Sequence, residues 1–283
     1  MNAPMRQLKD GEITFLSGAS VLVGRVFQPA SLPQAIIVLH GATGVPQGFY
    51  RAFAEWLAGQ GFAVLTYDYR DFGRSATHHV RRSKATIFDW TLTDQVAAQA
   101  EAERRFPGVP LWVIGHSLGG LFLPWHEGAA RMDRVITVAS GLVHVTDHPW
   151  PYQAAARAFW YGPGAVTTGL LGYTPGRALG MGSDLPKGVY WQWREFCTTR
   201  YFEQSPAARG LPEPDWMALK APLKIVAIAD DVMVPPKAVW RLMQIYPAAM
   251  KRQLTLHPEP GGKIGHLGAF RRENSALWAK IIA

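Results

Sequence analysis

The chain has 283 residues, of which 48% are hydrophobic, and it carries a formal net charge of +8 at pH 7. This length and apolar content suffice for one large core, whereas no apolar run is long enough to span a bilayer. The single cysteine, Cys197, excludes an internal disulfide and fits a reducing compartment. Because the segment 1–12 is polar and lacks a signal-peptide core, we expect a cytoplasmic protein without integral membrane association.

Apolar runs and helical spacing alternate along most of the chain. In chain order, the patterns predict a hairpin at 12–16 and 20–28, strands at 35–39, 62–67, 111–114 and 135–139, and helices at 48–60, 86–105 and 121–130. The alternation resumes with strands at 223–229 and 252–257 and helices at 236–245 and 269–282. Alternation with short connections is typical of an α/β fold, so we expect a mostly parallel sheet of about eight strands with helices on both faces.

The segment 143–216 interrupts this alternation. It is rich in Pro, Gly and Trp, and within it 152–161 and 187–199 have helical spacing. Because it follows the sixth predicted strand, it is interpreted as a helical cap or lid inserted into a core formed by 1–142 and 217–283.

Basic residues gather between positions 70 and 84. They are Arg70, Arg74, His78, His79, Arg81, Arg82 and Lys84. No aromatic residues alternate with them as in single-strand binders, so nucleic acid is not predicted as a partner. A solvated surface is the preferred interpretation of the charge; a loop that grips an anionic arm of a substrate is the alternative.

Residues 113–120 read Val-Ile-Gly-His-Ser-Leu-Gly-Gly, which combines a buried strand with a sharp turn at Ser117. Gly115 and Gly119 remove Cβ atoms where such a turn is crowded, and the turn holds the serine hydroxyl above the end of the sheet. The free N–H groups at the start of a following helix would stabilise negative charge there. The pattern is typical of a nucleophile elbow and makes Ser117 the candidate nucleophile.

A serine nucleophile needs a base within hydrogen-bond reach and a carboxylate that orients the base. In a parallel sheet, loops at the carboxyl ends of strands supply such groups. His266 follows the last predicted strand in a loop flanked by glycines, and Asp230 and Asp231 follow the strand that ends at 229. Spacing does not separate the two aspartates. Asp231 lies farther out and is preferred, with Asp230 as a turn-former.

An oxyanion formed at Ser117 needs backbone N–H donors. Leu118, directly after the nucleophile, supplies one, and the loop after the strand 35–39 supplies the other, with Ala42 preferred and Thr43 second. No cluster of His, Cys and Asp has metal-ligand spacing, and no glycine-rich nucleotide motif is present. No metal and no cofactor are therefore predicted.

Outside the insertion, the chain resembles the α/β-hydrolase superfamily. The resemblance rests on His-Gly-Ala at 40–42, Asp-Tyr-Arg at 68–70 with Gly-Arg-Ser at 73–75, Gly-His-Ser-Leu-Gly at 115–119, the segment 231–235 and Gly-His at 265–266. More narrowly, 42–50 and 180–186 are similar to a bacterial group of predicted serine hydrolases. That likeness implies catalytic Ser117, Asp231 and His266 and says little about the substrate.

In this superfamily an insertion after the sixth strand is usually a lid. Four of its aromatic residues here are candidates for an apolar acyl pocket, with packing inside the lid as the alternative: Trp150, Trp160, Trp191 and Trp193.

The resemblance and the ordered Ser, Asp, His set together predict a carboxylesterase that acts on a small apolar ester through an acyl-serine intermediate. The alternatives are a thioesterase that uses Arg81 and Arg82 to hold a phosphorylated carrier, a peptidase, and a non-catalytic binding protein. The sequence leaves the oligomeric state open, a homodimer included.

Overall fold

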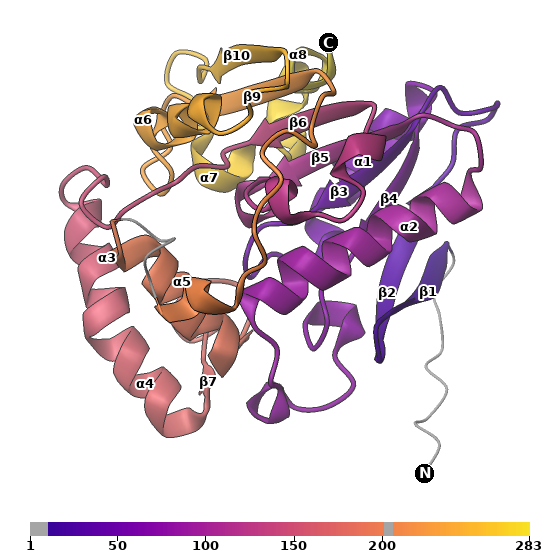
Figure 1. Cartoon of the computed structure of the whole chain (residues 1–283). Coiled ribbons are helices and arrows are strands. Elements are labelled where there is room, and N and C mark those ends of the chain that lie inside the picture. The colour runs from indigo at the N-terminus through magenta and orange to yellow at the C-terminus, as the bar shows by residue number, and fades with distance from the viewer. Residues whose placement is uncertain (1–10, 201–205) are drawn as a thin grey trace.

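An eight-stranded, mostly parallel sheet forms the centre of the computed structural model, which describes residues 11–200 and 206–283 (Figure 1). The strand order is β1-β2-β4-β3-β5-β6-β9-β10. β1 and β2 form an antiparallel hairpin, β2 runs antiparallel to β4, and the other neighbours are parallel. The predicted fold class is confirmed. The strands are β1 (Glu12–Ser17), β2 (Ser20–Phe27), β3 (Ile36–His40), β4 (Ala63–Tyr67), β5 (Leu111–His116), β6 (Arg134–Val138), β9 (Leu223–Ile228) and β10 (Lys251–Leu256).

The central strands are buried on both faces because helices cover each side of the sheet. Every residue of β3 and β4 is buried, and successive side chains point to opposite faces. Val38 therefore joins the apolar cluster under α2 and α6, whereas Ile37 joins the cluster under α1 and α8. These helices are α1 (Arg51–Gly59), α2 (Gln95–Arg105), α6 (Pro236–Val239) and α8 (Trp278–Ile282).

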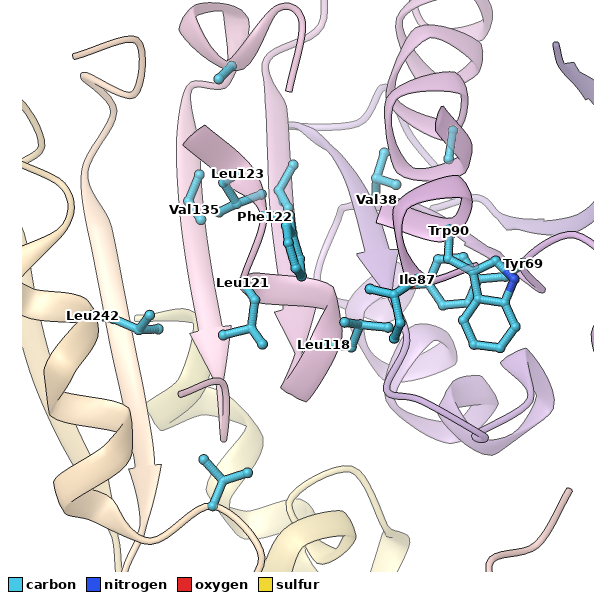
Figure 2. Packing of buried hydrophobic residues seen from close by; sticks show 14 of the residues in the cluster. Val38, Tyr69, Ile87, Trp90, Leu118, Leu121, Phe122, Leu123, Val135 and Leu242 are labelled. Atoms are coloured by element: carbon cyan, nitrogen blue, oxygen red, sulfur yellow. The ribbon is translucent and has the colours of Figure 1, made fainter. Parts of the chain in front are cut away.

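Trp90 is a central residue of the first cluster. It is fully buried, its ring stacks on that of Tyr69 with centroids 4.9 Å apart, and its Nε1 donates to the Arg70 carbonyl at 3.0 Å (Figure 2). Trp90 lies in a π-helical turn, Asp89–Asp94, that precedes α2. The helix predicted at 86–105 is therefore two segments of different winding.

The chain after the predicted nucleophile is less regular than expected. The helix predicted at 121–130 is wrong; the structure has short 3₁₀ turns at Ser117–Gly120, Leu123–Trp125 and Ala129–Arg131. Pro124 has no N–H to donate, and Gly128 has a left-handed φ of 87°, so a continuous α-helix cannot form.

The insertion between β6 and β9 is largely helical and lies to one side of the sheet (Figure 1). Its core is aromatic: the Trp160 ring lies 4.5 Å from Phe159, 5.0 Å from Trp193 and 5.7 Å from Tyr190. Two predicted helices are present as α3 and α5, whereas α4 and the β7–β8 pair were not predicted. The elements are α3 (Tyr152–Tyr161), α4 (Pro163–Leu171), β7 (Tyr173–Thr174), β8 (Leu185–Pro186) and α5 (Lys187–Thr198).

Replacing Trp90 with alanine should lower the free energy of unfolding by about 3–5 kcal/mol, because it empties a fully buried site. The matched control is Trp150→Ala, since the Trp150 side chain is 77% exposed and its loss should change stability by less than about 0.5 kcal/mol. Urea unfolding followed by circular dichroism measures both. Equal unfolding midpoints for the two variants would contradict this account of the core.

Candidate active site

Ser117 lies at the turn directly after β5 with a φ of 53°, in the left-handed region where a residue with a side chain is strained. A Cβ on Gly115 would overlap the backbone of Gly119 and Gly120, and a Cβ on Gly119 would overlap the backbone of His40. Only glycine fits at both positions. The sequence thus forces a tight turn that leaves Ser117 at the carboxyl end of a central strand.

His266 lies in the short helix α7 (Gly265–Gly268), where its Nδ1 is 2.7 Å from Oδ2 of Asp231. A carboxylate only accepts hydrogen bonds, so in the neutral ring Nδ1 carries the proton and Nε2 is left as the base. The other Asp231 oxygen accepts from the N–H groups of Met233 and Val234, at 2.8 and 3.0 Å. The carboxylate is therefore fixed in one orientation against the ring.

The neighbouring aspartate has a different role. Asp230 accepts from the backbone N–H groups of Ile264 and Gly265, at 3.0 and 2.9 Å, and so holds the loop that leads into α7. The structure places Asp231, rather than Asp230, against His266. Spacing in the sequence could not separate the two aspartates, because their roles depend on how the loop after β9 folds.

Ser117 and His266 line one cavity of about 250 Å³ between the sheet and the insertion. Its other lining residues are mostly apolar, among them Ile87 and Leu118, which come from separate segments of the chain (Figure 2). The structure records no hydrogen bond between the Ser117 hydroxyl and the His266 ring. Such contacts are often long before substrate binds.

One predicted oxyanion donor needs correction. The Ala42 N–H donates to the hydroxyl of Tyr50 at 2.9 Å, so it is directed into the protein rather than toward a substrate. Thr43 lines the cavity, and no described residue accepts from its N–H. Leu118 also lines the cavity, at the start of a 3₁₀ turn whose first N–H groups lack helical partners. Of the two candidates in this loop, only Thr43, the second choice from sequence, has an N–H without a described acceptor.

Comparison with known proteins places this geometry in a family context. Residues 31–161 match the family model described as serine aminopeptidase, S33. Human monoglyceride lipase is 27% identical over 96 residues, which cover 34% of this chain and 31% of that protein. A Synechocystis protein named as an esterase is 30% identical over 115 residues, 40% of this chain and 31% of the relative. The matched segments thus span about a third of these curated relatives.

Solved structures extend the likeness over nearly the whole chain. A soluble variant of Saccharomyces cerevisiae monoglyceride lipase, in complex with a substrate analogue, superposes with a TM-score of 0.65 at 12% identity, covering 99% of this chain and 96% of that one. The monoacylglycerol lipase of Paleococcus ferrophilus gives 0.58 at 17% identity, covering 92% and 96%. At these identities, the likeness establishes the fold.

The chain has the α/β-hydrolase fold. Two of the four predicted pocket tryptophans line the cavity, Trp160 and Trp193. The prediction is wrong for the other two, which do not line it. Trp150 is 77% exposed, and Trp191 packs 5.0 Å from the Tyr190 ring, with the Arg194 guanidinium 5.7 Å from its own ring. Helical periodicity could not separate these outward positions from inward ones.

The basic cluster at 70–84 does not line this cavity either. Arg70 binds the buried Asp94 carboxylate at 2.7 Å, and Arg74 binds Glu12 at 2.8 Å. Both arginines therefore form ion pairs within the fold. Arg81 and Arg82 are exposed and are not among the residues that line the cavity. A grip on a carrier phosphate next to Ser117 therefore has no support from the geometry.

A buried polar chain connects the loop after β3 to the catalytic candidate His266. Nδ1 of His116 is 2.8 Å from the Tyr50 hydroxyl, and Nε2 of His116 is 2.9 Å from the His266 carbonyl. The carbonyl can only accept, so Nε2 of His116 carries the proton and its Nδ1 accepts from Tyr50. Tyr50 in turn accepts from Ala42. Sequence reasoning gave His116 no role, since strand alternation turns its side chain away from the Ser117 hydroxyl.

This proton arrangement requires an uncharged His116. Full burial and the nearby His266 ring hold the pKa of His116 well below its usual range. A protonated ring would donate at both nitrogens and leave the Tyr50 proton without an acceptor. The chain of bonds therefore runs in one direction, from Ala42 through Tyr50 and His116 to the backbone of His266.

Two further buried histidines, His40 and His126, belong to the core. Nε2 of Gln99 lies 3.0 Å from His40 and 3.1 Å from His126, and burial lowers the pKa of both rings, that of His126 to about 4. In the ranges that the structure describes, no three His, Cys, Asp or Glu side chains are grouped as metal ligands. Those ranges also contain no helix with the length and apolar character needed to cross a bilayer.

His116→Leu should slow the phosphonylation of Ser117 by a fluorophosphonate about tenfold, because it removes the hydrogen bond that positions the His266 backbone. His116→Gln can return an N–H to that carbonyl and should recover most of the rate. Second-order inactivation rate constants, with circular dichroism to check folding, measure the effect. Equal rates for wild type and the folded leucine variant would show that His116 has no positioning role.

Proposed function

We propose that this protein is a serine esterase of the α/β-hydrolase superfamily that cleaves carboxylic esters with an apolar acyl group through an acyl-serine intermediate. The observation that carries the proposal is that one apolar cavity holds both a strained serine and a histidine whose Nδ1 is bound to a buried carboxylate. The curated relatives named monoglyceride lipase and esterase support the same reaction class.

In the proposed first half-reaction, Nε2 of His266 removes the proton of the Ser117 hydroxyl as its oxygen attacks the ester carbonyl carbon. The resulting oxyanion accepts from the N–H groups of Leu118 and Thr43, each worth roughly 10²- to 10³-fold in rate. Asp231 keeps the imidazolium oriented. The tetrahedral intermediate then collapses, the alcohol leaves with the proton from His266, and the acyl group stays on Ser117.

In the proposed second half-reaction, a water molecule attacks the acyl carbon while His266 takes one of its protons. Collapse of this intermediate releases the carboxylic acid and returns the proton to the Ser117 oxygen. The same base therefore serves both halves, which accounts for the need to fix its tautomer through Asp231.

The cavity supports a short apolar acyl group. Its volume, about 250 Å³, lies below the ~300–1,000 Å³ common for pockets that hold drug-sized ligands. Aromatic and thioether side chains form part of its lining: Phe159, Trp160, Met181 and Trp193. Because α3 and α5 of the segment 143–216 supply three of these, we propose that this segment is the lid of a core formed by 1–142 and 217–283.

A peptidase of the same fold has less support. The matching family model is described as a serine aminopeptidase, and such an enzyme must hold the amino terminus of a peptide. Among the described residues that line the cavity there is no Asp or Glu to pair with an ammonium group. An ester with an uncharged acyl arm fits this lining better.

A fluorophosphonate probe should label the wild-type protein, and Ser117→Ala should abolish the labelling, because the probe reacts only with an activated serine. Thermal unfolding should show the variant to be folded. Failure of the wild type to label, or labelling that persists in the Ser117→Ala protein, would refute the proposed nucleophile.

Among p-nitrophenyl esters, kcat/KM should be highest for short acyl chains and fall by at least tenfold for chains too long for the cavity. Enlarging the cavity with Trp193→Ala should shift the preference toward longer chains. Steady-state kinetics over an acyl series measure this. A wild-type preference for the longest chains, unchanged in Trp193→Ala, would contradict the assigned acyl site.

A further inference from the structure

Two polar side chains of the lid line the catalytic cavity but take no part in the proposed mechanism. They are His148 and Tyr152, and they face a lining that is otherwise mostly apolar. Their rings contact each other edge to face, with centroids 5.2 Å apart. Polar groups that are covered without a hydrogen bond are costly, so a substrate that fills the cavity and covers them must supply partners.

The hydrogen bond that His148 already makes defines what its free nitrogen can do. Nδ1 lies 3.1 Å from the carbonyl of Val232, which can only accept, so Nδ1 carries the ring proton. Burial lowers the pKa of His148, which keeps the ring neutral at pH 7 and leaves Nε2 as an acceptor. No side chain or backbone group of the described chain donates to Nε2.

Tyr152 offers the complementary group. Burial raises the pKa of its hydroxyl to about 12, so the hydroxyl is protonated and can donate. In the part of the chain that the structure describes, nothing accepts from this hydroxyl or donates to it. The rings that carry the acceptor of His148 and the donor of Tyr152 are therefore in contact, and neither of these two polar groups has a partner among the described residues.

We propose that His148 and Tyr152 form a subsite for a hydroxyl group of the substrate, which donates to Nε2 of His148 and accepts from the Tyr152 hydroxyl. A single alcohol group has one donor and two acceptor positions and satisfies both side chains at once. The inference rests on the proposed ester hydrolysis and narrows its substrate class to hydroxylated esters.

A charged group does not fit this subsite. Among the described residues that line the cavity there is no Lys, Arg, Asp or Glu, so a carboxylate or ammonium of the substrate would be buried without an ion partner. A plain hydrocarbon does not fit either, since it would remove both side chains from water without replacing their hydrogen bonds.

The hydroxyl can belong to the acyl arm or to the alcohol arm, and two matched ester pairs separate these sources. The acyl pair is p-nitrophenyl 3-hydroxybutanoate and p-nitrophenyl butanoate. The alcohol pair is 2-hydroxyethyl butanoate and propyl butanoate, followed by pH-stat titration. For one pair, wild-type kcat/KM should favour the hydroxylated ester by about tenfold or more.

Two conservative variants test the residues themselves. Tyr152→Phe removes the donor and keeps the ring, and His148→Asn keeps an N–H for the Val232 carbonyl but places no acceptor at the position of Nε2. Each should reduce the ratio of kcat/KM for the hydroxylated ester to kcat/KM for the plain ester several-fold or more. A residue that only supports the fold would lower both members of a pair together and leave their ratio unchanged.

The outcomes separate this inference from the proposed function. Hydrolysis of all four esters with equal kcat/KM within each pair, or preferences that survive in both variants, would overturn the hydroxyl subsite and leave the esterase intact. A wild-type protein that hydrolyses none of the four and also fails to react with a fluorophosphonate would overturn both.

Discussion

The hydrogen bond between Asp231 and His266 is the interaction on which the site depends. It fixes the proton on Nδ1 and leaves Nε2 as the base, and a ring turned the other way would present an N–H to the Ser117 oxygen. The bond is possible because β9 and β10 are parallel neighbours and end at the same edge of the sheet. Asp231 and His266 lie in the segments that follow these two strands. Parallel strand order therefore brings together residues 35 positions apart in the chain.

The loop that carries Asp231 and Val232 also connects the site to the insertion 143–216. Asp231 binds His266 through one oxygen and its own loop through the other, while the carbonyl of Val232, the next residue, accepts from His148. A movement of the insertion would therefore displace the loop that carries Asp231. The hydrogen-bond chain from Ala42 through Tyr50 and His116 supports the backbone of the same histidine. Hydrogen bonds therefore hold His266 both at its ring and at its backbone carbonyl.

Much of the fold and the placement of Ser117, Asp231 and His266 could be predicted because their signals are local. Apolar runs mark buried strands, glycines mark the elbow, and polar residues directly after strands mark the sheet edge. The catalytic roles of the three residues stay predictions until activity is measured. The exclusion of Ala42 was not predictable, since it depends on Tyr50 folding back over the loop. The exposed Trp150 and the broken helix after Ser117 likewise depend on packing that periodicity does not encode.

The most direct measurement of the central claim is the mass of the protein quenched in acid during turnover of p-nitrophenyl butanoate. The account predicts a burst of p-nitrophenol and a protein heavier by one butanoyl group, carried on the peptide that contains Ser117 and absent from Ser117→Ala. Turnover without any acylated protein, or an acyl group on a different residue, would contradict it.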